Sequence, residues 1–149
     1  MKLFVINGPN LNMLGVREKS IYGEQSYAGL LAFVQKVCDR EGIDVECFQS
    51  NHEGVLVDII QSAHEKADGI VINPAAYTHT SIAILDALKA VNLPAIEVHL
   101  SNIYEREAFR HVSYAGKACI TAYYGLGFEG YEKALVHLKK LLKDEKTDN

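Results

Sequence analysis

The chain has 149 residues, about the length of one domain, of which 48% are hydrophobic and 23% are charged. This composition excludes a mainly disordered chain, a collagen and a disulfide-rich peptide. The formal net charge of −4 disfavours a nucleic-acid binder, which usually carries a basic excess, but allows a small anionic substrate held by local arginines. We therefore expect a single domain over residues 1–149, with a polar tail at 144–149 that frays.

Short apolar runs typical of buried strands alternate along the chain with segments of helical periodicity. Gly42 is placed to end the first helix, and Asn92 and Pro94 are placed to end the third. Ser50 and Glu53 have the spacing of a capping box before the second helix. In chain order, the sequence predicts a strand over 3–6, a helix over 30–37, a strand over 43–48, a helix over 55–63, a strand over 69–72, a helix over 82–88, a strand over 95–98, a short helix near 105–109, a strand over 118–122 and a helix over 131–142.

Five short apolar strands separated by helices predict an α/β fold, with a parallel sheet that is covered on both faces. Right-handed crossovers favour a flavodoxin-like, doubly wound, five-stranded parallel sheet in the order 2-1-3-4-5. Ligands of such sheets bind outside the carboxyl ends of the strands. The residues that follow each strand are therefore the first candidates for a functional site.

Amides, hydroxyls, imidazoles and a carboxylate gather at the ends of three of these strands. Residues 7–12 follow the first strand, residues 73–81 follow the third, and residues 97–102 complete and follow the fourth. Turns also favour Asn, Pro and Ser, so the clustering alone fits either a structural or a functional role. At one edge of a parallel sheet, these three segments would converge on a polar site.

The connection from Asn7 to Glu24 is longer than the roughly two to six residues that usually join a strand to a helix. It contains Arg17 and Tyr22, together with glycines at 15 and 23. Loops of this length often close over active sites. The alternative is a surface loop with a solvated Arg17 and a packed Tyr22.

The segment Gly125–Gly130 matches the G-x-G-x-x-G pattern of dinucleotide-binding proteins and lies between a predicted strand and a predicted helix. That fingerprint also needs a second strand, with an acidic residue about 20 positions further on. Only residues 131–149 follow, and most of them are predicted to be helical, so the unit cannot be completed. We expect these glycines to allow tight packing between strand and helix, and binding of NAD or FMN at this turn is the competing hypothesis.

Neither the six histidines nor the three cysteines show the spacing of a metal site. Cys38, Cys47 and Cys119 form no C-x-x-C pair, and we expect them to be free thiols in a reducing cytosol. Four apolar residues precede the first polar turn, fewer than the roughly 7–15 of a signal peptide or the roughly 20 of a membrane helix. The expected location is therefore cytoplasmic, with no membrane or nucleic-acid partner.

Three segments of the chain resemble the motifs of type II 3-dehydroquinate dehydratase and occur in the order of that family. Together they cover nearly the whole chain, and they are far more specific in combination than singly. One departure is visible, because Lys19 stands where the family often has a proline after the Arg-Glu of the long loop. The segments are Ile6–Gly15 followed by Arg17-Glu18 and Ile21–Gly23, then Ile72–Ser81, and then Glu97–Ile103 followed by Arg106-Glu107 and Phe109-Arg110.

The resemblance implies a flavodoxin-like fold and a lyase that reversibly removes water from 3-dehydroquinate to give 3-dehydroshikimate. This reaction is a step of the shikimate pathway, which leads to chorismate and the aromatic amino acids, and in some organisms it serves quinate breakdown. The resemblance further implies that no metal or organic cofactor is used. It also implies a homo-oligomer, namely a homododecamer built from trimers.

The resemblance makes Tyr22 the base that removes a proton next to the substrate ketone. An unperturbed tyrosine has a pKa of about 10 and is therefore a poor base at neutral pH. A guanidinium about 5 Å away, at an effective dielectric of about 20, favours the tyrosinate by roughly 3 kcal/mol. Arg17, on the same loop, is the candidate for that charge.

His99 would protonate the departing hydroxyl group, because imidazole titrates near the working pH of most enzymes. Glu97 lies two residues earlier on the same predicted strand and therefore points to the same face. It would hold His99 in the required tautomer and favour its charged form. The alternative is that Glu97 is a buried partner of some other basic group.

The remaining site residues follow from the resemblance. Asn10 would hold a water against the enolate oxygen, where preorganised neutral donors are effective stabilisers. Asp86 would reach the site of a neighbouring subunit, although by itself it reads as a solvated residue on a helix. Backbone amides suit a carboxylate, and an arginine adds a bidentate fork. The expected substrate-binding residues are accordingly Asn73, His79, Asp86, Leu100, Ser101 and Arg110.

Overall fold

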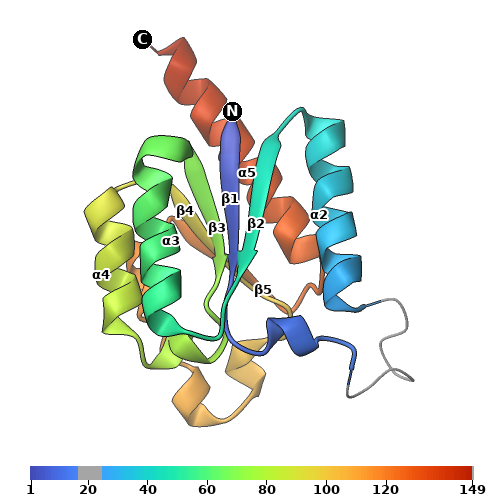
Figure 1. Ribbon diagram of the computed structural model, residues 1–149, viewed down its shortest axis with the longest axis vertical. Coiled ribbons are helices and arrows are strands. Elements are labelled where there is room, and N and C mark those ends of the chain that lie inside the picture. The colour runs from blue at the N-terminus through green and yellow to red at the C-terminus, as the bar shows by residue number, and fades with distance from the viewer. Residues whose placement is uncertain (17–24, 149) are drawn as a thin grey trace.

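Five parallel strands form the centre of the computed structural model, which describes residues 1–16 and 25–148 (Figure 1). The strand order is β2-β1-β3-β4-β5, and every neighbouring pair is parallel, which confirms the predicted flavodoxin-like topology. The strands are β1 (Lys2–Asn7), β2 (Asp44–Gln49), β3 (Gly69–Asn73), β4 (Ala95–His99) and β5 (Thr121–Tyr124).

Four long helices cover the two faces of the sheet in pairs (Figure 1). Helices α2 (Tyr27–Glu41) and α5 (Glu129–Thr147) share one buried cluster with the sheet, whereas α3 (Glu53–Lys66) and α4 (Ile82–Val91) share the other. An α-helix lies between β1 and β2, between β2 and β3, and between β3 and β4, whereas three short 3-10 turns connect β4 to β5. Among the helices of residues 1–16 and 25–148, none is long and apolar enough to cross a membrane.

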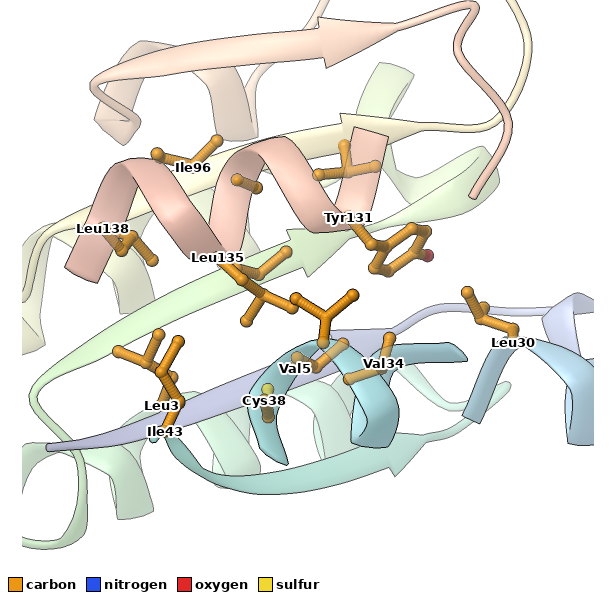
Figure 2. Close-up of a cluster of buried hydrophobic side chains, with 14 of the residues drawn as sticks. Leu3, Val5, Leu30, Val34, Cys38, Ile43, Ile96, Tyr131, Leu135 and Leu138 are labelled. Atoms are coloured by element: carbon orange, nitrogen blue, oxygen red, sulfur yellow. The ribbon is translucent and has the colours of Figure 1, made fainter. Parts of the chain in front are cut away.

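The alternation of side chains along β1 explains why its residues 3–6 are all apolar. Leu3 and Val5 pack in the cluster of α2 and α5, which is drawn in Figure 2, whereas Phe4 and Ile6 pack in the cluster of α3 and α4. A strand buried on both faces has no polar side, so it reads as a continuous apolar run. β3 and β4 are buried along their whole length for the same reason.

Helix ends follow the expected chemistry at most positions. Gly42 and Asn92 adopt left-handed backbone conformations, with φ of 68° and 52°, and end α2 and α4 as predicted. The expected capping box at Ser50 is wrong. The hydroxyl of Ser50 accepts a hydrogen bond from the His52 N–H, and the helix starts at Glu53. Glu53 is therefore the first residue of the helix, whereas a capping box needs the glutamate at the third.

Two expected elements differ in the last third of the chain. The strand expected over 118–122 begins only at Thr121, because Ala115–Ala118 forms a 3-10 turn and the Ile120 side chain is 48% exposed. The short helix expected near 105–109 is instead two 3-10 turns, Ile103–Glu105 and Ala108–Arg110. Helix α5 remains helical through Thr147, and the fraying expected at 144–149 stays a prediction.

Candidate active site

The carboxyl ends of β1, β3 and β4 surround a cavity of about 360 Å³. Three segments that are far apart in the sequence therefore meet at one edge of the sheet, as the polar strand ends led us to expect. The cavity is lined by Pro9, Asn10, Leu11, Asn73, Ala75, Ala76, His79, His99, Leu100, Ser101, Ile103, Arg106 and Arg110.

A direct backbone contact joins the segment after β1 to the segment after β3. The Gly8 N–H donates to the Asn73 carbonyl at 2.8 Å, and a Cβ atom on Gly8 would lie 2.4 Å from the Pro74 carbonyl oxygen. No side chain fits there. Beyond this crossing, Asn10 takes up a left-handed conformation (φ 70°), and its N–H donates to Asn51 Oδ1 at 3.0 Å. The backbone of Asn10 is thus fixed at the cavity wall.

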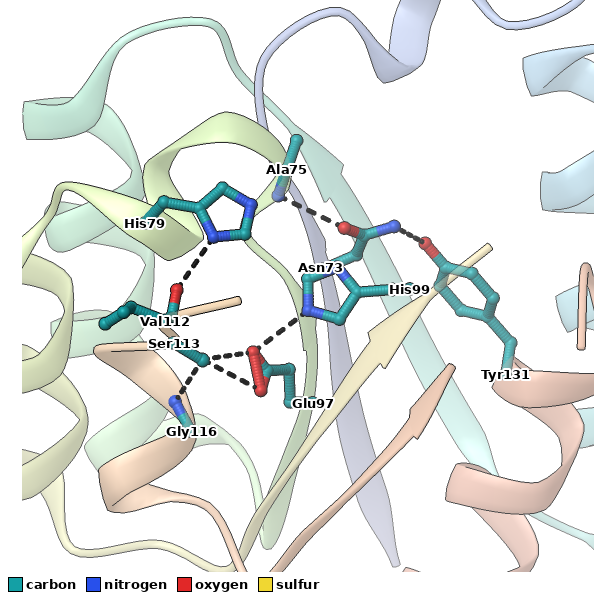
Figure 3. Close-up of polar contacts among 9 residues, drawn as sticks. All are labelled: Asn73, Ala75, His79, Glu97, His99, Val112, Ser113, Gly116 and Tyr131. Atoms are coloured by element: carbon teal, nitrogen blue, oxygen red, sulfur yellow. Dashed lines mark hydrogen bonds and ion pairs between the residues drawn. The ribbon is translucent and has the colours of Figure 1, made fainter. Parts of the chain in front are cut away.

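Glu97 and His99 form a buried pair on β4 (Figure 3). The Nε2 atom of His99 lies 2.9 Å from Glu97 Oε1, and the two residues are only 5% and 2% exposed. Their spacing of two residues places both side chains on the same face of the strand. Among the described residues, His99 is the ion-pair partner of Glu97, which agrees with the pairing expected from the sequence and not with its alternative.

The ring of His79 is oriented by a backbone carbonyl (Figure 3). Its Nδ1 atom lies 2.7 Å from the Val112 carbonyl oxygen. A carbonyl oxygen only accepts, so Nδ1 carries a proton, and in the neutral form of the ring Nε2 is the acceptor. His79 therefore offers the cavity a nitrogen that can receive a hydrogen bond from a hydroxyl group.

Two arginines line the cavity, and only one of them is among the site residues expected from the sequence. Arg110 donates through Nε to Glu107 Oε2 at 2.7 Å, and its guanidinium lies 5.1 Å from the centre of the Phe109 ring. Arg106 also lines the cavity, although no role was predicted for it from the sequence. These two cations explain how a chain of net charge −4 can offer a site to an anion.

Asn73 is held from both ends of its side-chain amide (Figure 3). Its Oδ1 atom accepts from the Ala75 N–H at 3.1 Å, and its Nδ2 atom donates to the Tyr131 hydroxyl at 3.0 Å. That hydroxyl donates in turn to Asn7 Oδ1 at 2.6 Å. Complete burial raises the pKa of the Tyr131 phenol, so it stays neutral and keeps its proton for Asn7.

Replacing Tyr131 with phenylalanine is expected to lower the free energy of unfolding by about 2–4 kcal/mol. The substitution leaves Asn7 Oδ1 and Asn73 Nδ2 without their hydrogen-bond partner, and each buried unsatisfied group costs about 1–3 kcal/mol. Urea unfolding measures the change. The control is Tyr123→Phe, which removes a partly buried hydroxyl 2.9 Å from His137 Nδ1. Equal losses in the two variants would contradict the role of the buried network.

Three expected site residues fall outside this geometry. Arg17 and Tyr22 lie outside the described residues. Asp86 is exposed on α4 and does not line the cavity within the described chain, so its expected reach into a neighbouring subunit stays a prediction.

The glycine-rich turn serves the strand and the helix that flank it. Gly125 and Gly127 have φ of 76° and 58°, and a Cβ atom on Gly130 would lie 3.3 Å from Val98 Cγ1. The Gly127 N–H also donates to the Leu100 carbonyl at 3.1 Å, so the turn supports the cavity wall. α5 follows the turn, and no strand follows α5 up to residue 148. This agrees with the expectation that the glycines allow close packing of strand and helix.

The cysteines are free thiols, and the described part of the chain contains no group of three or more metal-ligating side chains close enough to hold an ion. Burial raises the pKa of the Cys47 thiol to about 11 and those of Cys38 and Cys119 to about 12. All three therefore stay protonated at neutral pH, so none of them is a ready nucleophile.

The free energy of unfolding is expected to fall as the pH rises above about 9. The unfolded chain releases the thiol protons near the ordinary pKa of 9.0, whereas the folded protein retains them to about 11 or 12. Urea unfolding on both sides of pH 9 measures the decline. A Cys38→Ala/Cys119→Ala variant should show a shallower decline, and identical slopes would contradict the assignment to the thiols.

Comparison with known proteins places this arrangement in a family. The family model described as "Dehydroquinase class II" matches residues 1–139. A 3-dehydroquinate dehydratase of Clostridium acetobutylicum is 52% identical over 95% of this chain and 99% of its own, and one of Caldicellulosiruptor bescii is 54% identical over 95% and 98%. The crystal structure of a type II dehydroquinase from Butyrivibrio crossotus superposes with a TM-score of 0.89 at 52% identity, covering 93% of this chain and 97% of that one. The chain therefore belongs to the class II dehydroquinase family.

Proposed function

We propose that this protein catalyses the reversible dehydration of 3-dehydroquinate to 3-dehydroshikimate, a step of the shikimate pathway. The observation that carries the proposal is a buried carboxylate–imidazole pair, Glu97 and His99, at the edge of a cavity that also gathers two arginines. Relatives that are about half identical over nearly their whole length are 3-dehydroquinate dehydratases. An acid and an anion site are what elimination of water from a hydroxylated carboxylate requires.

The reaction begins with removal of a proton next to the ketone, and the C–H electron pair becomes that of an enolate. We assign the base to Tyr22 and the charge that favours its ionised form to Arg17. The motifs at these two positions support the assignment. Preorganised neutral donors stabilise a developing oxyanion. Asn10 lines the cavity and its backbone is held by Asn51, so we assign Asn10, with a water, to the enolate oxygen.

The enolate then collapses to a conjugated double bond and expels the hydroxyl group as water. We assign the required proton to His99. Because Nε2 faces Glu97, the ring offers Nδ1 as the nitrogen that can give a proton to the substrate. Glu97, 2.9 Å away, stabilises the imidazolium that precedes the transfer and fixes the ring.

The substrate carboxylate is best placed against the backbone amides of Leu100 and Ser101, with Arg110 nearby. These residues line one cavity with His79 and Asn73, which we assign to the substrate hydroxyl groups. Anions favour clustered N–H donors and guanidinium forks. Asp86 of a neighbouring subunit would complete the site in a homododecamer built from trimers, located in the cytoplasm and using no cofactor.

The proposal is tested by mixing the purified protein with 3-dehydroquinate and following the conjugated enone product in the ultraviolet. Absence of turnover would overturn it. Borohydride should trap no substrate on the enzyme, because the three strand-end motifs that form the site contain no lysine for a Schiff base. Titration with NAD or FMN tests the competing use of Gly125–Gly130, and we expect no binding.

A further inference from the structure

A side chain from outside the three strand-end segments reaches the buried Glu97 carboxylate (Figure 3). The hydroxyl of Ser113 lies 2.5 Å from Glu97 Oε1 and 3.0 Å from Oε2. Ser113 precedes the 3-10 turn Ala115–Ala118, which packs beside β4. No sequence pattern pointed to this residue, because it lies 16 positions from Glu97 in an irregular segment.

The direction of each hydrogen bond in this cluster can be deduced. The Gly116 N–H donates to Ser113 Oγ at 2.9 Å, so the serine oxygen acts as the acceptor there. Its own hydrogen is then free to point to Glu97, which accepts it as a carboxylate. Because the Glu97 carboxylate can only accept, the proton between Glu97 and His99 lies on Nε2 of the imidazole. The chain of donors thus sets the tautomer of His99.

The same segment packs tightly on the carboxylate and orients the second imidazole of the cavity. A Cβ atom on Gly116 would lie 2.8 Å from Glu97 Oε2 and 2.9 Å from Ser113 Oγ, so a larger residue there would displace one of these side chains. Val112, next to Ser113, supplies the carbonyl that holds His79, and the Tyr114 N–H donates to the Thr78 carbonyl at 2.9 Å. Residues 112–116 therefore form a support behind both histidines.

We propose that Ser113 is a positioning residue, which aligns Glu97 so that His99 keeps its proton on Nε2 and presents Nδ1 to the substrate. The inference rests on the proposed dehydratase function. Ser113 would touch no reacting atom, and it would act only through Glu97. Its loss should therefore change the chemical step and leave substrate binding nearly intact.

Ser113→Ala is expected to lower kcat for dehydration about tenfold and to change KM by less than about twofold. Tenfold corresponds to about 1.4 kcal/mol, near the upper end of the roughly 0.5–1.5 kcal/mol that a typical hydrogen bond contributes. In a Glu97→Gln background the same substitution should cost almost nothing further, because its target carboxylate is already gone. Ser113→Thr, which retains a hydroxyl group, should recover most of the rate.

Gly116→Ala tests the same contact from the other side and should lower kcat without raising KM. Ser62→Ala is the matched control, since that hydroxyl donates to the Ile59 carbonyl within α3 and should leave kcat unchanged. Wild-type kcat in Ser113→Ala, or losses that multiply in the double variant, would overturn the inference while the function stands. A wild-type protein that does not turn over 3-dehydroquinate would overturn the function itself.

Discussion

Replacing Tyr22 with phenylalanine is expected to lower kcat for dehydration of 3-dehydroquinate about a thousandfold, while the free energy of unfolding stays within about 1 kcal/mol of wild type. The substitution removes one oxygen, which is the proposed proton acceptor, and positioned acid–base groups contribute about 10²–10⁴-fold to enzymatic rates. Product absorbance measures the rate, and urea unfolding measures the stability.

The matched control for this variant is again Tyr123→Phe, because the hydroxyl of Tyr123 contacts His137 on α5. That variant should keep wild-type kcat. Activity retained in Tyr22→Phe would remove Tyr22 from the role of base. Equal loss in both variants would indicate a general effect of losing a tyrosine hydroxyl.

His99→Gln is expected to lower kcat for dehydration about a thousandfold by a different route. The variant loses the proton donor for the leaving hydroxyl but keeps the proposed base. The enolate can then only return by taking a hydrogen from the Tyr22 phenol, which has meanwhile exchanged its proton with the solvent. In heavy water the carbon next to the ketone should therefore acquire deuterium without loss of water, whereas Tyr22→Phe should show neither exchange nor dehydration.

Exchange at that carbon is followed by nuclear magnetic resonance of the recovered substrate, beside the ultraviolet assay for product. The control is His64→Gln, which changes an exposed histidine on α3 and should leave both rates unaltered. Wild-type dehydration by His99→Gln would exclude this residue as the acid. A variant that neither dehydrates nor exchanges would place His99 in the first step instead.

The fold could be predicted because its central strands are buried on both faces and therefore read as apolar runs. β1, β3 and β4 show this pattern, and their predicted limits lie close to the observed ones. β5 lies at the edge of the sheet and is only half-buried, so its own residues are less clearly apolar. The apolar residues just before β5 were therefore predicted to belong to the strand. Ile120, which suggested a strand, is exposed.

The part of the site that could be predicted is the part whose position follows from the order of the strands. Asn10 lies just after β1, whereas Asn73 and His99 are the last residues of β3 and β4. The carboxyl ends of these strands must meet, and all three residues line the cavity. Ser113 and Tyr131 were missed because their partners lie far away in the sequence. No local periodicity or spacing encodes a contact between a hydroxyl in an irregular segment and a strand carboxylate.

The Tyr131 hydroxyl, which joins Asn7 to Asn73, is also the point at which α5 reaches the ends of two central strands. Synthesis on the ribosome releases β1 and β3 long before α5, the last helix of the chain. Until that helix emerges and docks, the amide of Asn73 lacks its partner. The cavity wall that Asn73 forms therefore gains this support only after α5 has docked on the sheet.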